Sequence, residues 1–338
     1  MVGKKWHKTL MFLIFTVVGL VHSDKTMLGG HGGVHDRMGA GAAELGTGNT
    51  GTARVTSSAP AYWNPALLAF PRKASLNLGG EYRSLKRNGA VSSLQGRIAP
   101  NMGLGLSILN RGDMNVPVYD KDENYLGAAR PQDMGFYLGI GLKTSRKNSF
   151  GTAIQWFHSS KDIGGRGDIN FIGIFNLGWY HLWNKNFKTA VVLRNLGLNK
   201  DLSASYELKT GEADSDHSLD RTGKDFFPKT LIVACMYTLP FWKRHVDSYF
   251  EFLNFQLKNK LFDIDPDHHV MDFRVGADWK YNKLISLRTG YDRGSISFGF
   301  GYTWIFNNKK KLHFDYALLL ERGFVTFNPF SFNFKYVL

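Results

Sequence analysis

The sequence contains one cysteine, Cys235, in 338 residues. A single thiol cannot form an internal disulfide, so a secreted scaffold held together by disulfides is excluded. The mostly apolar residues around it, 231–237, predict a packed strand residue rather than a reactive thiol. The sequence also has no long apolar run after its N-terminus, so membrane-spanning helices are not expected.

Aromatic residues and glycine are abundant instead. Aromatic side chains make up 14% of the chain and glycine occurs 37 times, yet the mean hydropathy is only −0.24. This combination is typical of an all-β protein whose strands are apolar on one face. The formal net charge is +14, but the basic residues are spread over predicted turns such as 243–244 and 309–311. We therefore expect contact with anionic outer-membrane lipids and no binding of nucleic acid.

The first 23 residues have the features of a signal peptide. Lys4, Lys5 and Lys8 form a charged region, residues 9–21 form an apolar region, and a small-residue cleavage site follows. The alternative is an uncleaved membrane anchor. It is disfavoured because the apolar run is shorter than the roughly 20 residues that a helical span needs. The sequence thus predicts export, with removal of residues 1–23.

Residues 295–306 show a pattern that recurs along the rest of the chain. Aromatic side chains such as Phe298 and Trp304 occupy the even positions, and small residues such as Ser297 occupy the odd ones. Successive side chains of a strand point to opposite faces, so this strand has one apolar face and one face of small or polar groups. About fourteen strands are predicted in this way, near residues 72–84, 90–99, 101–110, 133–143, 148–158, 168–182, 186–196, 228–240, 245–257, 268–281, 283–291, 295–305, 311–321 and 329–338.

The connections between these strands alternate in length. Most of those at one end, such as 99–101 and 144–147, are short, whereas most at the other end, such as 111–132 and 159–167, are longer and polar. Outer-membrane barrels have this arrangement, and a closed barrel gives every backbone group a partner inside hydrocarbon. We therefore predict an all-β fold, a transmembrane antiparallel β-barrel of about fourteen strands, over residues 72–338. A soluble secreted β-sandwich or β-helix is the alternative.

Residues 24–71 differ from the predicted strands because they are rich in glycine and poor in apolar residues. We expect them to form an N-terminal hatch that plugs the barrel. A short helix is predicted at residues 65–70, with Asn64 as its cap and Pro65 at its first position.

Two stretches of this hatch, residues 39–48 and 59–67, resemble the start of FadL-type long-chain fatty-acid transporters. They are closer still to the shorter branch that includes Por-type secretion-shuttle barrels. Leu67 departs from the pattern, since the family usually has glycine there. The signature residues are Tyr62, Trp63, Asn64, Pro65 and Ala66.

Further stretches fit the same family, among them Arg194-Asn195-Leu196-Gly197. The resemblance implies a fourteen-stranded barrel with an N-terminal hatch in the outer membrane of a diderm bacterium. Hydrophobic ligands would enter from outside and leave through a gap in the wall or past the hatch. The last strand ends in alternating aromatics and Leu338, as do the signals that the barrel-assembly machinery reads.

Two arginines are candidates for binding a ligand carboxylate in the lumen. Arg274 and Arg288 both fall on the polar face of predicted strands, and a guanidinium suits a carboxylate because it donates two parallel hydrogen bonds. The alternative is a lattice of salt bridges with Asp272, Asp278 and Asp292, in which the arginines serve the structure of the barrel.

Two RGD tripeptides leave an adhesive role open. Arg111-Gly-Asp113 and Arg166-Gly-Asp168 are both expected in outer loops. Such tripeptides bind adhesion receptors, but they are also ordinary turn composition.

No enzyme, cofactor or metal site is predicted. The match of residues 46–51 to G-x-G-x-x-G lacks a preceding strand and a βαβ unit. The same-face pairs His313 with Asp315 and His245 with Asp247 have no clearly placed serine, so we interpret them as polar packing in the lumen. The remaining histidines lack a carboxylate or thiol set for a metal.

We therefore predict a barrel, not an enzyme, that takes up long-chain fatty acids or similar hydrophobic molecules by passive passage through a plugged lumen. The alternative is a secretion-shuttle or surface-adhesion barrel that binds proteins rather than lipids.

Overall fold

The computed structural model describes most of the chain from Met38 onward. The predicted signal peptide and hatch residues 24–37 lie outside the described residues. Within the part that is described, no helix is long and apolar enough to cross a membrane. Beyond residue 37, the positions that are not described are 72, 84–86, 114–115, 120–123, 131, 163–165, 198–201, 205–222, 226–228, 242–243, 257–268, 307–309, 321–329 and 338.

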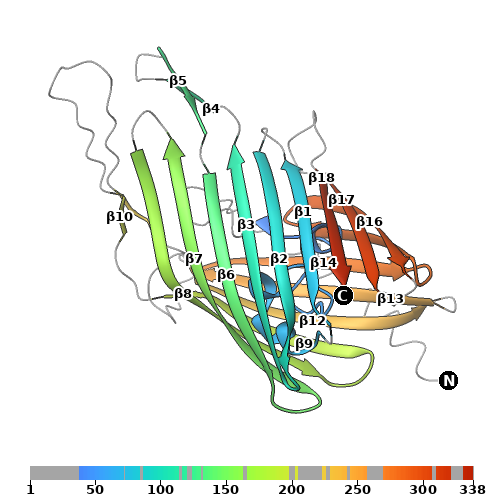
Figure 1. Ribbon diagram of the computed structural model, residues 1–338. Helices are drawn as coiled ribbons and strands as arrows, with labels where there is room; N and C mark the ends of the chain where they lie inside the picture. The colour runs from blue at the N-terminus through green and yellow to red at the C-terminus, as the bar shows by residue number, and fades with distance from the viewer. Residues whose placement is uncertain are drawn as a thin grey trace. The chain divides into compact units, whose positions relative to one another are not determined.

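Fourteen antiparallel strands close into a barrel (Figure 1). The barrel closes where β1 pairs with β18, from Ser75 opposite Val337 to Tyr82 opposite Phe330. All fourteen predicted strands have a counterpart within a few residues, so the predicted transmembrane antiparallel barrel is confirmed. The wall strands are β1 (Ser75–Arg83), β2 (Arg87–Ala99), β3 (Met102–Asp113), β6 (Gln132–Lys143), β7 (Asn148–Asp162), β8 (Arg166–Leu182), β9 (Phe187–Leu196), β12 (Lys229–Phe241), β13 (Arg244–Gln256), β14 (His269–Lys280), β15 (Ile285–Asp292), β16 (Ser295–Ile305), β17 (Lys311–Leu320) and β18 (Phe330–Val337).

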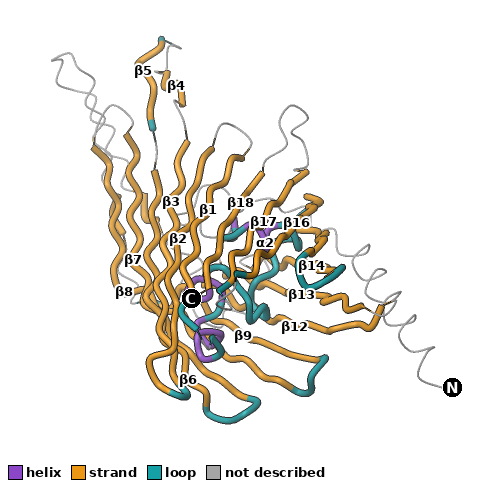
Figure 2. Tube along the Cα trace, turned by 45° about the vertical axis from the view of Figure 1, so that its right-hand side comes forward, coloured by secondary structure: helices purple, strands orange, loops and turns teal. Residues whose placement is uncertain are grey.

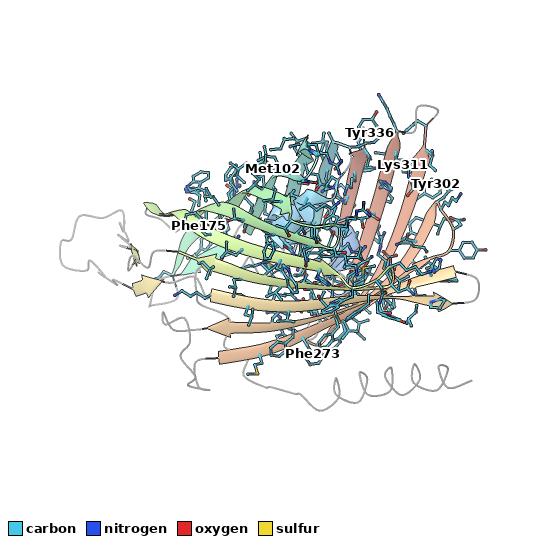
Figure 3. All side chains as sticks on the ribbon, turned by 90° about the horizontal axis from the view of Figure 1, so that it is seen from below. Met102, Phe175, Phe273, Tyr302, Lys311 and Tyr336 are labelled. Carbon is cyan, nitrogen blue, oxygen red and sulfur yellow. The ribbon has the colours of Figure 1, made fainter. Side chains whose placement is uncertain are left out.

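The side chains of the wall alternate between its two faces, as the sequence pattern predicts. In β16, Phe298 and Trp304 are exposed on the outside, whereas Ser297 is buried inside. Seen from below, Phe273 and Tyr302 project away from the interior (Figure 3). The outer face is therefore rich in exposed apolar side chains, and the strands of the closed wall pair with one another all the way around, as suits a barrel in contact with acyl chains.

One of the predicted long loops is wrong. Strand β7 continues to Asp162 and β8 begins at Arg166, so most of the predicted loop 159–167 belongs to these strands. Two of the long connections contain short hairpins of their own. In each hairpin two extended segments pair with one another beyond the wall. These hairpins are β4 (Val116–Tyr119) with β5 (Tyr125–Ala129), and β10 (Leu202–Ala204) with β11 (Gly223–Asp225).

The same extension of the strands corrects the placement of both RGD tripeptides. Arg111 lies within β3 with its side chain buried against Glu81, and Arg166 and Asp168 lie within β8. A buried, ion-paired Arg111 is not displayed to a receptor, so this first tripeptide does not support an adhesive surface.

The described hatch residues, 38–71, contain three short helical segments inside the ring of strands (Figure 2). Helix α2 (Ala42–Leu45) packs against Ala317 and Leu319 of β17. Helix α3 (Pro60–Trp63) leads into the 3₁₀ helix η2 (Pro65–Ala69), which packs on the opposite part of the wall. The predicted helix after Asn64 is confirmed, in 3₁₀ rather than α form, with Pro65 at its start.

Candidate functional site: the hatch in the lumen

The backbone of the hatch lies directly against glycines of the wall. A Cβ atom at Gly290 would lie 2.0 Å from the Gly48 nitrogen, and one at Gly276 would lie 2.1 Å from the Thr47 oxygen. On the other side of the barrel, a Cβ at Gly103 would lie 1.8 Å from the carbonyl oxygen of Leu68. No other residue type leaves room for such contacts, so the inward-facing glycines permit the hatch to pack on the wall.

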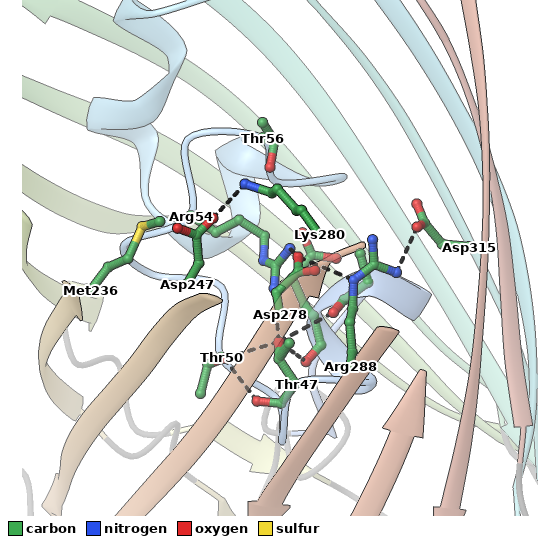
Figure 4. A network of polar contacts seen from close by, with 12 residues as sticks. Thr47, Thr50, Arg54, Thr56, Met236, Asp247, Asp278, Lys280, Arg288 and Asp315 are labelled. Atoms are coloured by element: carbon green, nitrogen blue, oxygen red, sulfur yellow. Dashed lines mark hydrogen bonds and ion pairs between the residues drawn. The ribbon is translucent and has the colours of Figure 1, made fainter. Parts of the chain in front are cut away.

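Buried ion pairs join the hatch to the wall on the β14–β17 side (Figure 4). Arg54 of the hatch donates to the Asp278 carboxylate at 2.9 Å and to the Thr47 hydroxyl at 3.1 Å. Arg288 lies 3.2 Å from the same Asp278 and 2.7 Å from Asp315. Burial opposes the charge of Arg54, but Tyr249, Asp278 and Glu44 more than compensate, so the pKa of Arg54 is raised above its ordinary value. The guanidinium therefore stays charged inside the barrel.

Both arginines predicted to bind a carboxylate are held in these ion pairs. Arg274 donates to Asp292 at 3.1 Å and to the Asn49 carbonyl of the hatch at 3.3 Å, and Arg288 is bound as described above. Asp272 pairs with Arg293 instead. The arrangement is the salt-bridge lattice that the sequence left as the alternative. A ligand-binding role for Arg274 and Arg288 stays a prediction, and a ligand carboxylate would have to compete with their present partners.

The signature asparagine holds three segments together. Asn64 is fully buried, and its side-chain oxygen accepts a hydrogen bond from the Ala66 nitrogen at 3.0 Å. Its amide group donates to the Thr52 carbonyl at 3.1 Å and to the Trp179 carbonyl of β8 at 3.3 Å. One side chain thus caps η2, ties it to the preceding hatch loop and fixes both to the wall.

Replacing Asn64 with alanine is expected to lower the free energy of unfolding by about 2–4 kcal/mol, because a helix cap is lost and two buried carbonyls lose their donor. Urea unfolding in detergent micelles measures the change. Asn184→Ala is the matched control, since Asn184 accepts backbone hydrogen bonds at 2.9 Å in an exposed turn. Equal effects of the two substitutions would contradict the role assigned to Asn64.

Arg194, which was not among the predicted site residues, lies beside the signature aromatics. It donates to the Trp63 carbonyl at 3.0 Å, and its guanidinium carbon lies 4.5 Å from the centre of the Tyr62 ring. Its side chain is buried. Five other buried arginines have a carboxylate partner, whereas Arg194 has none within ion-pair distance among the described residues. Those five are Arg54, Arg83, Arg111, Arg274 and Arg288.

Gln155 of β7 provides a second hydrogen-bond donor without a partner among the described residues, close to the signature aromatics. Gln155 is fully buried and lies opposite Tyr137, whose ring meets the Tyr62 ring edge-on at 5.3 Å. Its oxygen accepts from Asn176 at 3.3 Å. Its amide nitrogen, like the Nε atom of Arg194, has no hydrogen-bond partner in the described part of the protein. The only sequence signal for this region was the family-like stretch that begins at Arg194.

Apolar side chains of the lumen wall surround these donors. Inward-facing residues of three strands pack on the hatch and form an apolar cluster with it, beside the buried ion pair of Arg111 with Glu81. A mostly apolar lining with a few donors is typical of sites for small hydrophobic ligands. The cluster consists of Ala40, Ala59, Ala61, Tyr62, Trp63, Leu68, Val91, Leu109 and Tyr137.

The histidine–aspartate pairs of the sequence do not form catalytic dyads. Asp247 accepts from Thr238 at 2.7 Å and binds Lys280, while Asp315 binds Arg288. His313 contacts the Thr303 hydroxyl at 2.8 Å. The described residues also contain no group of three or more His, Cys, Asp or Glu side chains that could hold a metal.

This architecture is similar to that of proteins whose structures are known. No known protein-family profile and no curated protein matches the sequence. Among solved structures, the monoaromatic hydrocarbon channel CymD is 13% identical, with 89% of this chain and 97% of CymD covered and a TM-score of 0.60. The toluene transporter TbuX of Ralstonia pickettii is 13% identical, with 90% of this chain and 99% of TbuX covered and a TM-score of 0.57. The toluene transporter TodX of Pseudomonas putida is 13% identical, with 88% of this chain and 96% of TodX covered and a TM-score of 0.56.

At this level of identity the likeness establishes the fold. The chain has the fourteen-stranded barrel fold of these hydrocarbon channels, which are FadL-type outer-membrane transporters. The resemblance read from the hatch signature is thus confirmed for the fold. Placement in the shorter, Por-type branch rests on the sequence alone.

Proposed function

We propose that this protein takes up hydrophobic molecules across the outer membrane of a diderm bacterium, where it arrives after removal of the signal peptide. The observation that carries this proposal is the apolar cluster between hatch and wall, in which Val91, Leu109 and Tyr137 face inward. A pore for polar solutes gains nothing from such a lining, because apolar surface in contact with water is unfavourable. The hydrocarbon channels of the same fold support the same class of cargo.

Passage is passive and requires the hatch to shift or the wall to open. Backbone contacts such as those at Gly290 and Gly103 leave no space between hatch and wall where they occur. The wall is irregular next to the signature residues. The pairing of β8 with β9 shifts register there, and Asn195 has a positive φ of 59°. A ligand that reaches Tyr62 would leave past this irregular wall or through a displaced hatch.

Long-chain fatty acids are the proposed cargo within this class. Their chains match the apolar cluster, and their carboxylate matches the two uncommitted donors, Arg194 Nε and Gln155 Nε2. Hydrogen bonds between charged groups are worth more than neutral ones. Arg194 is therefore a better candidate than Arg274 or Arg288 for the first contact with a carboxylate, since it would not have to leave an ion pair.

Uptake of radiolabelled oleate and of labelled toluene, in cells that lack other transporters of this class, tests the proposal. Wild-type protein is expected to raise uptake above an empty vector. Arg194→Gln is expected to lower oleate uptake about tenfold, the equivalent of one charge-assisted hydrogen bond, and to leave toluene uptake unchanged. Arg97→Gln, a substitution of an exposed arginine, is the matched control.

The two substrates test separately whether the protein transports hydrophobic molecules and whether fatty acids are its cargo. Equal uptake with protein and with empty vector, for both compounds, would contradict hydrophobic transport. Uptake of toluene alone would retain the class and exclude fatty acids as the cargo.

A further inference from the structure

Five of the six short turns at one rim of the barrel carry basic residues. The two chain ends of the barrel and all six short turns lie at this rim, because β1 starts there and β18 ends there. The six turns contain seven lysines and arginines and no aspartate or glutamate. Arg146, Lys147, Lys185, Lys283 and Lys310 lie among the described residues; Lys243 and Lys309 are counted from the sequence and lie outside them.

The acidic residues closest to this rim do not neutralise it, because they face inward. Asp247, Asp278 and Asp315 are buried in the lumen and bound to lysine or arginine there. In contrast, Arg146, Lys147, Lys185 and Lys283 are exposed, and none forms an ion pair within the described part of the chain. The loops at the opposite end contain fourteen aspartates and glutamates. The two ends of the barrel thus differ in the sign of their charge.

Exposed aromatic side chains accompany the basic residues at the same rim. Trp183 shares a turn with Lys185, and Tyr281 shares one with Lys283; they are 53% and 47% exposed. Trp304 and Phe306, at the β16–β17 turn, are 43% and 49% exposed. Tryptophan and tyrosine favour the boundary between hydrocarbon and headgroups. The neighbouring lysines therefore lie at the level of the headgroup phosphates.

We propose that this basic rim binds the headgroup phosphates of the anionic phospholipids in the leaflet around it. Its charges come from five hairpins spread around a closed wall and do not converge on one pocket. A single small anion contacts at most one such turn, whereas a leaflet contacts all of them at once. The alternation of exposed aromatics with lysines matches a headgroup layer above acyl chains. The rim thus orients and retains the barrel in an anionic leaflet.

Native mass spectrometry of the full-length mature protein, released from nanodiscs of equal phosphatidylglycerol and phosphatidylethanolamine, tests the proposal. We expect several-fold enrichment of bound phosphatidylglycerol over the bulk ratio, with less enrichment at high salt because screening weakens charge attraction. The variant R146Q/K147Q/K185Q/K283Q is expected to lose the enrichment. The control variant K121Q/K209Q/K258Q/K260Q removes four charges from the loops at the opposite end and is expected to keep it.

Three results would overturn the proposal. The first is a bulk lipid ratio on the wild-type protein, and the second is equal loss in both variants. The third is complete competition by millimolar inorganic phosphate, which would indicate a site for free anions rather than a leaflet surface. The heat-dependent shift of a folded barrel on a gel shows that each variant is folded before its lipids are counted.

Discussion

Replacing Asp278 with asparagine is expected to lower the free energy of unfolding by about 3–5 kcal/mol, since breaking a buried ion pair leaves an uncompensated charge. Asp278 is shared by Arg54 of the hatch, at 2.9 Å, and by Arg288 of the wall, at 3.2 Å. Arg288 keeps Asp315, but Arg54 has no second carboxylate within ion-pair distance among the described residues. The hatch is therefore expected to lose its buried ion pair with β14 and to loosen before the barrel itself unfolds.

Urea titration of the protein in detergent micelles measures the global change, and protease cleavage within residues 38–71 reports release of the hatch. Lys280→Gln is the control on the same strand. Lys280 also pairs with an aspartate, but its side chain is 52% exposed, so its loss is expected to change stability by less than about 1 kcal/mol. An Asp278→Asn protein as stable as Lys280→Gln would show that the buried network does not hold the hatch.

Replacing Gly290 with valine is expected to displace the hatch from the wall. The new Cβ would lie 2.0 Å from the Gly48 nitrogen and 2.2 Å from the Thr47 carbonyl carbon, and backbone atoms cannot turn aside as a flexible side chain does. Overpacking of this kind costs about 3 kcal/mol, which shifts the equilibrium between docked and released hatch by about a hundredfold. We expect an assembled barrel with a protease-sensitive hatch and raised permeability to small dyes.

Gly96→Val is the matched control for this substitution. A Cβ at Gly96 would meet only Ala74, at 3.5 Å and beyond, which is an ordinary contact. Both changes place a β-branched residue in a wall strand, so their strand propensity is the same. A hatch that is equally protected in both variants would contradict the tight contact at Gly290.

The sequence determined the wall of this protein to within a few residues. The alternation in residues 295–306 depends only on neighbouring positions, because a strand turns each successive side chain to the other face. The same local reasoning predicted the cap at Asn64, since a cap and its helix are adjacent in the chain. The resemblance of the hatch signature to FadL-type transporters implied the same strand number and the same plug as the alternation and the composition had predicted.

Only the tertiary structure decided which polar groups meet. Arg54 and Asp278 are 224 positions apart, and no local pattern specifies that pair. Arg274 and Arg288 were selected for their place on a polar face, but the carboxylates that they meet depend on how β14, β15 and β17 pair in the wall. Arg194 was passed over because its distinction, a buried guanidinium with no carboxylate within ion-pair distance among the described residues, exists only after the other charges are placed. Strand faces follow from a local period, whereas the interior of a plugged barrel depends on contacts between distant segments.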